Sequence, residues 1–145
     1  MSKHLYVVAL DGSEWSERAA KRAIHLAEKS HAKVELLTVL NWPVIHPVIA
    51  ESVATPPVDK VSEERYVTNK IMAPILEKFA ESDVTITTRI LWGDPEFEIS
   101  EYVKTNHAHM LFVGRRGRSR LADLVLGSVA NKLAHCVGVP IVLVP

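Results

Sequence analysis

A glycine-rich and arginine-rich stretch near the end of the chain carries the residues best suited to chemistry. Two residues separate Gly114 from Gly117, nine separate Gly117 from Gly127, and Ser128 follows directly. Glycine lets backbone N–H groups approach a ligand, and a helix beginning at Gly127–Ser128 would direct its free N–H groups at an anion. The pattern predicts a phosphate site, in which Gly114 permits close backbone approach and Gly117 adopts a positive φ.

Four arginines accompany these glycines, and guanidinium groups are strong donors to phosphate oxygens. We expect one or two of them to contact phosphate; the alternative for each is a solvated loop residue. Neither the Gly-Lys-Ser/Thr of a Walker A loop nor the GxGxxG dinucleotide fingerprint is present. The arginines are Arg115, Arg116, Arg118 and Arg120, and the one acid among them is Asp123.

Composition limits the classes of partner. The chain has 145 residues, and 17 Lys and Arg balance 17 Asp and Glu, so no overall basic field favours nucleic acid. The single cysteine, Cys136, cannot form an internal disulfide. The first apolar run, residues 5–10, is too short to span a membrane and lacks a signal-peptide cleavage pattern. We therefore expect a cytoplasmic protein without membrane insertion.

Apolar runs alternate with helix-like segments along the whole chain. Runs that are continuously apolar suit strands covered on both faces, as in parallel sheets. Helices are expected after Ser13 as a possible cap, across 59–79 with a distortion at Pro74, after Pro95 and from Gly127. This order predicts one α/β domain over 1–145 with a doubly wound parallel sheet. The expected strands are 5–10, 34–40, 84–91, 109–113 and 141–144.

In such a sheet ligands bind beyond the carboxyl ends of the strands. The turns that follow the first four strands carry Asp11, Val39 to Trp42, Trp92–Gly93 and Gly114, and we expect them to meet at one cleft. Asp11 has two interpretations, a ligand to the bound molecule or a cap of the first helix, and its place at a strand end favours the first.

In the spacing of these glycines and the serine, the chain resembles the universal stress protein family, in its ATP-binding class. The family's motif G-x2-G-x9-G-S/T is matched in full by the glycines and serine described above. The resemblance covers essentially the whole chain, including Asp11-Gly12-Ser13, Gly93-x-Pro95 and the last strand. It implies an open five-stranded parallel sheet of order 3-2-1-4-5 with helices on both faces, a Rossmann-like fold of the adenine nucleotide alpha hydrolase type.

The resemblance also implies the ligand and its contacts. It assigns ATP, with Mg²⁺ or Mn²⁺ beside the phosphates, and places adenine and ribose at Asp11 and the backbone around Val39. It further implies a homodimer in which the last strand, Ile141 to Val144, pairs across a two-fold axis; an uncharged edge strand suits that pairing. The candidate binding residues are Asp11, Val39, Gly114, Arg115, Gly117, Gly127, Ser128 and Val129.

Other side chains that could bind a metal, react or stack on a base are expected to have structural roles. His107 and His109 lack further ligands at zinc-like spacing, so we expect no metal site built from protein side chains. Cys136 is expected in the apolar core with Leu133 and not as a nucleophile. Trp42, beside a proline at a strand end, is expected to provide hydrophobic cover in preference to stacking on adenine. No catalytic residue is assigned.

The leading hypothesis is a homodimeric ATP-binding module of the stress response, because the loop lacks an evident group to orient a hydrolytic water. One alternative is an enzyme on the same fold, either a slow ATPase or a nucleotidyl transferase. The other is a partner-binding scaffold whose cleft holds no functional nucleotide and whose edge strand recruits another protein.

Overall fold

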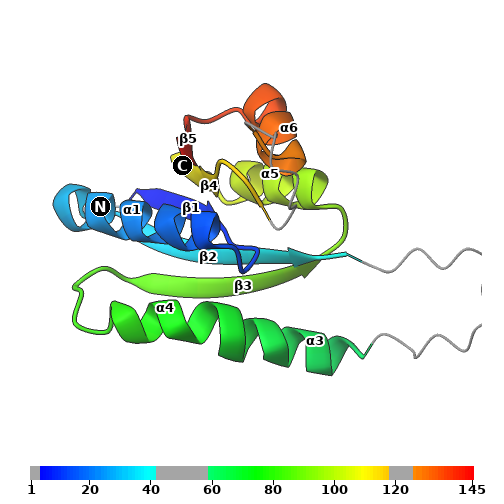
Figure 1. Ribbon diagram of the computed structural model, residues 1–145. Coiled ribbons are helices and arrows are strands. Elements are labelled where there is room, and N and C mark those ends of the chain that lie inside the picture. The colour runs from blue at the N-terminus through cyan, green and yellow to red at the C-terminus, as the bar shows by residue number, and fades with distance from the viewer. Residues whose placement is uncertain (1–3, 42–58, 118–125) are drawn as a thin grey trace, which may run out of the picture.

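The computed structural model describes residues 4–41, 59–117 and 126–145, and its centre is one five-stranded parallel sheet. The strand order is β3-β2-β1-β4-β5, which confirms the predicted fold and its order (Figure 1). The strands are β1 (Leu5–Ala9), β2 (Lys33–Leu40), β3 (Ile86–Trp92), β4 (Met110–Gly114) and β5 (Ile141–Val144). The helices are α1 (Glu14–Ser30), α3 (Lys60–Tyr66), η1 (Val67–Met72), α4 (Ala73–Lys78), α5 (Pro95–Thr105) and α6 (Ser128–Cys136).

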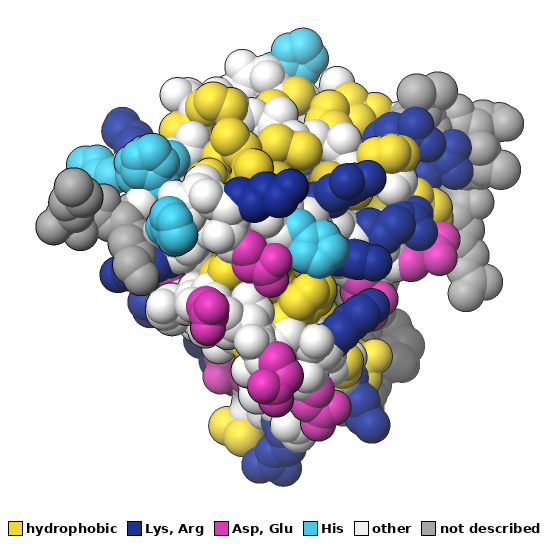
Figure 2. Space-filling model, turned by 90° about the vertical axis from the view of Figure 1, so that its left-hand side faces the viewer, with side chains coloured by type: hydrophobic (Ala, Val, Ile, Leu, Met, Phe, Trp, Pro, Cys, Tyr) yellow, Lys and Arg dark blue, Asp and Glu magenta, His cyan; other side chains and the backbone are white. Residues whose placement is uncertain are grey.

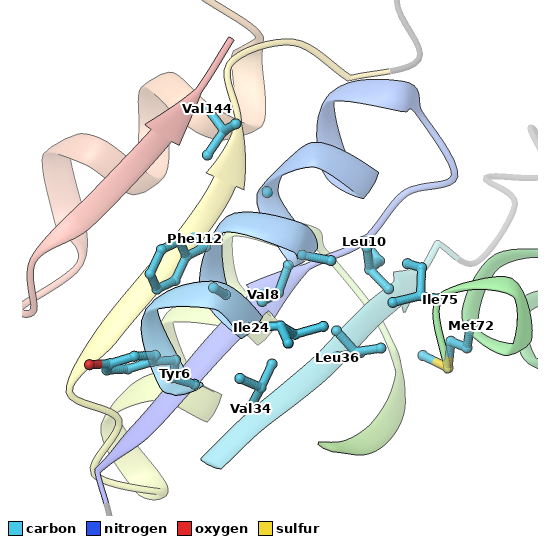
Figure 3. Packing of buried hydrophobic residues seen from close by; sticks show 14 of the residues in the cluster. Tyr6, Val8, Leu10, Ile24, Val34, Leu36, Met72, Ile75, Phe112 and Val144 are labelled. Atoms are coloured by element: carbon cyan, nitrogen blue, oxygen red, sulfur yellow. The ribbon is translucent and has the colours of Figure 1, made fainter. Parts of the chain in front are cut away.

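Consecutive residues of the central strand β1 enter two different cores. Val8 packs with α1, η1 and α4 on one face of the sheet, while Val7 packs with α5 and α6 on the other. Both side chains are fully buried, and removing such a side chain from water is worth about 1.5–3 kcal/mol. Figure 3 shows the first core, where Leu36 of β2 and Phe112 of β4 lie on the same side as Val8. Two covered faces explain why the strand sequence is apolar without alternation.

Helix α1 lies close to the sheet because its inner face is built from small residues. Ala20, Ala23 and Ile24 belong to the first core and are completely buried. Ser13 caps the helix, as predicted, by accepting a hydrogen bond from the Ser16 N–H at 3.2 Å. The helix ends at His31, whose φ of 59° is left-handed. The position of α1 next to β1 and β4 matters for the site, because its first turn borders the carboxyl edge of the sheet.

The helical segment before β3 is distorted, as the proline within it predicts. Pro74 has no N–H, and the turn before it is π-helical over Val67–Met72, with the Ala73 N–H bonded to the Thr68 carbonyl. Asp59 caps the first turn through the Val61 N–H, and its hydrogen bonds with Ser62 hold the pKa of its carboxyl below the ordinary value. The distortion is thus a wider turn inside an otherwise continuous helical run.

Cys136 departs from its predicted place. The thiol is exposed at the end of α6 instead of buried in the core, and its sulfur lies 3.3 Å from the Ser100 hydroxyl of α5. Leu133, one turn earlier, is the residue of α6 that is fully buried. The apolar spacing identified the helix correctly, but the Cys136 side chain lies beside Ser100 of α5 and belongs to neither core.

The amino ends of the strands form the face shown in Figure 2, opposite the carboxyl edge. Charges of both signs mix there with histidines, so this face presents no field of a single sign. His4 and His109, which precede β1 and β4, stack with ring centroids 4.3 Å apart, and His109 Nδ1 accepts the Leu5 N–H. Within the three described ranges, no helix is long and apolar enough to cross a membrane.

Candidate functional site

A cleft of about 200 Å³ opens at the carboxyl edge, where the strand order reverses between β1 and β4. The turns after β1 and β4 border it, as the sequence predicts, whereas β2 contributes Leu37 and Val39 from within the strand. From the turn after β3 it is Pro95, and not Trp92 or Gly93, that reaches the cleft. The lining residues are Ala9, Leu10, Asp11, Ser16, Leu37, Val39, Pro95, Ile99, Val113, Gly114, Arg116, Gly117, Gly127, Ser128, Val129 and Ala130.

All the predicted binding residues except Arg115 line this cleft. Arg116 lines it instead, while the Arg115 backbone N–H donates to the Val144 carbonyl at 2.7 Å and extends the pairing of β4 with β5. Arg115 Nε is buried and has no hydrogen-bond partner among the described residues. Trp42, Arg118, Arg120 and Asp123 lie outside the described residues. The chain thus brings together segments that are more than a hundred residues apart, from Asp11 to Ser128.

Asp11 is held in place by the first turn of α1. Its Oδ1 accepts the Ser13 N–H at 2.9 Å, and its own N–H donates to the Ser16 hydroxyl at 3.3 Å. Ser13, and not Asp11, is therefore the helix cap. The second carboxylate oxygen, Oδ2, faces Gly117, since a Cβ on that glycine would lie 2.7 Å from it. One oxygen of Asp11 has a structural role, and the other borders the cleft.

Gly114 is required by packing against α1. A Cβ at this position would lie 2.7 Å from Trp15 Cβ, 2.8 Å from the Trp15 carbonyl carbon and 2.9 Å from the Ser16 nitrogen. The residue does line the cleft, but the atoms that exclude a side chain belong to the protein. The close approach of α1 and β4 is thus enough to require a glycine here, and close approach of a ligand to Gly114 stays a prediction.

The prediction of a positive φ at Gly117 is wrong. Among the described glycines, left-handed φ values occur at Gly12 and Gly93. A side chain at position 117 is disfavoured for another reason, because its Cβ would lie against the carboxylate of Asp11. Gly127 lies behind it, with the Gly127 N–H donating to the Arg115 carbonyl at 2.7 Å, and a Cβ on Gly127 would be 3.4 Å from the Gly117 nitrogen. The two glycines thus allow the ends of the loop to close on each other.

The N-terminus of α6 lines the cleft, and no side chain caps its first N–H groups. Its cap residue is Gly127, which has no side chain to accept from the first N–H groups of the helix. Ser128, Val129 and Ala130 form the first turn and line the cleft. Free N–H groups and the positive end of the helix dipole favour an anion by about 0.3–1 kcal/mol at exposed sites. The nine-residue helix therefore presents an anion site without a side-chain cap.

Two contacts orient α6 relative to the rest of the cleft. Leu133 is completely buried in the second core. Lys132 Nζ lies 3.0 Å from Glu96 Oε1 in the first turn of α5, and this hydrogen bond raises the pKa of Lys132. The lysine is exposed, so the buried leucine and not the ion pair supplies most of the positioning energy.

The opposite end of the cleft is apolar. Val39 and Leu37 come from β2, and Pro95 and Ile99 come from α5. Leu37 and Ile99 are lining residues that the sequence reasoning missed, whereas Arg116 is one of the four loop arginines that it named as candidates. Leu37 and Val39 lie two apart on one strand, and Pro95 and Ile99 lie four apart on one helix, so period-two and helical spacing were the signals that could have found the apolar wall. One cleft thus combines an anion-binding end with an apolar end.

The described residues of this edge include no cluster of His, Cys, Asp and Glu side chains that could hold a metal ion. Across residues 4–41, 59–117 and 126–145, no group of three or more His, Cys, Asp and Glu side chains lies close enough to hold a metal ion. Asp11 and Ser128 are oxygen donors that line the cleft. Such a pair suits a cation that retains water and binds phosphate oxygens as well.

The open parallel sheet and the cleft at its switch point define a doubly wound α/β protein with a candidate ligand site at the carboxyl edge. The sequence profile of the Universal stress protein family matches residues 5–145, and the chain belongs to that family. It is 32% identical over 142 residues to the universal stress protein YxiE of Bacillus subtilis (strain 168), covering 95% of this chain and 96% of that protein.

Solved structures agree with the fold over the full length. The universal stress protein UspA from Lactobacillus plantarum superposes with a TM-score of 0.82 at 18% identity and covers 100% of both chains. A universal stress protein solved in complex with cAMP is 26% identical, with a TM-score of 0.65, and the match covers 100% of this chain and 98% of that one. The doubly wound sheet of order 3-2-1-4-5 is therefore shared with these relatives.

Proposed function

We propose that this protein binds an adenine nucleotide, with ATP as the ligand, in the cleft at the carboxyl edge. The observation that carries the proposal is the N-terminus of α6, which is capped by a glycine and lines the same cleft as Arg116. Phosphate groups suit that end, because backbone N–H groups and a guanidinium donate to their oxygens. The related structure with bound cAMP supports an adenine nucleotide as the class of ligand.

The apolar end of the cleft suits a purine base. Val39, Pro95 and Ile99 contribute apolar side chains to the cleft, and Val39 is the last but one residue of β2. Asp11 lies between the two ends, and its carboxylate can accept hydrogen bonds from ribose hydroxyls. Asp11 and Ser128 would hold Mg²⁺ or Mn²⁺ together with the phosphates. The metal would supply charge neutralisation of the phosphate oxygens.

We propose a binding module of the stress response as the role of the site, because hydrolysis needs a group that orients water. Among the described lining residues the one carboxylate is that of Asp11, and Asp11 already accepts from the Ser13 N–H. Prolonged incubation with labelled ATP tests the enzymatic alternative. Phosphate release that Ser128→Ala abolishes would favour an ATPase.

Titration calorimetry with ATP and Mg²⁺ tests the proposal directly. We expect a saturable heat with a Kd below about 100 μM, equivalent to roughly 5.5 kcal/mol. Ser128→Ala removes one hydroxyl and should weaken ATP binding about 5-fold, as for the loss of one hydrogen bond. Asn131→Ala, one turn further along α6 and exposed, is the matched control and should bind as the wild type does. No heat and no thermal shift at millimolar ATP would remove the proposal.

We further propose that the protein is a homodimer through the edge strand β5. β5 pairs with β4 on one side and ends the sheet, and its four residues carry no charge that would discourage a second strand. Val142 packs against the first core, whereas Leu143 is 36% exposed. The test residue is therefore Leu143, since a charge at Val142 would also disturb the fold.

Leu143→Lys is expected to give monomers. A lysine at this position would bring two like charges close together near the two-fold axis and remove apolar contact area. Light scattering coupled to gel filtration measures the mass of wild type and variant at matched concentration. Leu26→Lys, an exposed leucine of α1 (39% exposed), is the control for a surface charge. A dimeric Leu143→Lys variant would place the interface elsewhere.

A further inference from the structure

Ser16 is the one polar side chain among the buried residues of α1, and it lines the cleft. The residue is 2% exposed. A small residue is required there, because α1 lies so close to β4 that a Cβ on Gly114 would be 2.9 Å from the Ser16 nitrogen. Alanine would meet that requirement equally well, so the hydroxyl needs an explanation of its own. The other buried residues of the helix are Ala19, Ala20, Ala23, Ile24 and Ala27.

Capping of the helix does not account for this hydroxyl. The cap of α1 is Ser13, whose side chain accepts the Ser16 N–H at 3.2 Å. That bond uses the main-chain nitrogen of Ser16 and not its side chain. A Ser16→Ala change would therefore leave the helix cap in place. It would remove the hydrogen bonds that the Ser16 hydroxyl itself makes.

The Ser16 hydroxyl ties the turn after β1 to the helix at two points. It donates to the Ser13 carbonyl at 2.9 Å and accepts the Asp11 N–H at 3.3 Å. The first contact is the stronger of the two, because 3.3 Å is long for a bond from N–H to oxygen. One residue before Asp11, the Leu10 N–H still donates to Leu37 of β2 at 2.8 Å. The hydroxyl thus holds the main chain directly beyond that bond to the sheet.

These bonds fix the carboxylate of Asp11. Its Oδ1 accepts the N–H of Ser13, the residue whose carbonyl Ser16 holds. Gly12 between them has a left-handed φ of 86°, which lets the turn close. Ser16 therefore holds both the residue that carries the carboxylate and the residue that binds it. The remaining oxygen, Oδ2, faces Gly117, which also lines the cleft.

We propose that Ser16 is a positioning residue of the nucleotide site, and that its hydroxyl makes the site selective for ribonucleotides. This inference rests on the proposed function. A ribose O–H donates to Asp11 Oδ2, and Ser16 acts on the ligand through Asp11. An acceptor that is fixed before binding loses little entropy when the ligand arrives, so its hydrogen bond contributes more to affinity. A sugar without hydroxyls leaves that carboxylate oxygen without its donor.

Titration of the full chain with ATP and with 2′,3′-dideoxy-ATP, which lacks both ribose hydroxyls, tests this proposal in the presence of Mg²⁺. We expect the wild type to bind ATP about 10-fold more tightly, as for one hydrogen bond to a charged group. Ser16→Ala should weaken ATP binding about 5-fold and leave dideoxy-ATP within about 2-fold. Equal losses for both nucleotides would mean a merely structural role and would overturn the proposal. A wild type without any preference would do the same.

Two further variants separate this hydroxyl from other effects. Ser30→Ala removes a hydroxyl that also donates to a main-chain carbonyl of α1, that of Leu26, at the other end of the helix. It should leave the preference for ATP unchanged. Asp11→Ala should reduce the preference to within about 2-fold, and adding Ser16→Ala to it should weaken ATP less than about 2-fold further. A further loss of about 5-fold in that double variant would show that Ser16 acts on the ligand without Asp11, which overturns the proposal.

Amide hydrogen exchange without nucleotide tests the positioning by itself. In Ser16→Ala the N–H groups of Asp11 and Ser13 should exchange at least about 10-fold faster, because the turn opens more readily. The Ile24 N–H, in the middle of α1, should stay within about 2-fold of wild type. Unchanged exchange at Ser13 would overturn the proposal. A chain that binds no ATP but shows the faster exchange would contradict the proposed function and leave the positioning of Asp11 by Ser16 standing, so the two failures are distinguishable.

Discussion

Gly117→Val is expected to abolish ATP binding and leave the fold intact. A Cβ at this position would lie 2.7 Å from Asp11 Oδ2, while the next atom within reach, Asp11 Cγ, would be 4.0 Å away. The valine would therefore displace a carboxylate at the centre of the cleft and fill the space between Asp11 and α6. Gly117 does not adopt a left-handed φ, so the backbone itself tolerates the substitution.

The expected loss in ATP affinity is at least about 100-fold, or roughly 2.7 kcal/mol, with a Tm within about 3 °C of wild type. Titration calorimetry and thermal unfolding give the two values. Gly138→Val is the matched control, since a Cβ on Gly138 would meet nothing within 4 Å. An unfolded Gly117→Val variant would show that this glycine is structural, and unchanged ATP affinity would place the ligand elsewhere.

Gly114→Ala is expected to destabilise the protein even though the residue lines the same cleft. The added methyl group would lie 2.8 Å from the Trp15 carbonyl carbon and 2.9 Å from the Ser16 nitrogen, which are backbone atoms of α1. Neither β4 nor α1 can shift easily. β4 is paired with both β1 and β5, and α1 is packed on the sheet through buried alanines. Overpacking of this kind costs about 1–3 kcal/mol or more.

We expect a Tm about 10 °C lower for Gly114→Ala, using roughly 3 °C per kcal/mol for a domain of this size. Urea unfolding and calorimetry measure the change. Gly117→Ala is the internal control, because among the described residues its methyl group would meet the carboxylate of Asp11 and no backbone atom within 4 Å. A Gly114→Ala variant with wild-type stability and lost ATP binding would contradict the packing argument. It would return Gly114 to the role of a ligand-contacting glycine.

These two glycines belong to one sequence motif but differ in physical role. Spacing along the chain identified both as positions where a side chain is excluded. The atoms that exclude it come from Trp15 and Ser16 in one case and from Asp11 in the other, about a hundred residues away. No property of the loop sequence distinguishes these cases. Loss of ATP binding in a Gly114 variant can therefore follow from a packing defect between α1 and β4, whereas the same loss in a folded Gly117 variant would follow from a change at Asp11 within the cleft.

The sequence by itself determined the fold class and the edge at which the site lies. Continuous apolar strands require two covered faces, and alternation of strand and helix requires parallel pairing, so Asp11, Val39 and Gly114 had to reach the same edge. The helix caps also depend on local sequence alone. Ser13 and Asp94 cap their helices, as serine and aspartate commonly do. Such features depend on neighbours in sequence or on the strand period, which the chain encodes directly.

The tertiary structure decided which side chains line the cleft and which are exposed. Arg116 replaces Arg115 as a lining residue because the Arg115 N–H is used to pair with Val144 of β5. Cys136 is exposed beside Ser100 of α5, although its spacing from Leu133 is that of a buried position. Contacts between distant segments set these outcomes, and periodicity within one segment carries no information about them.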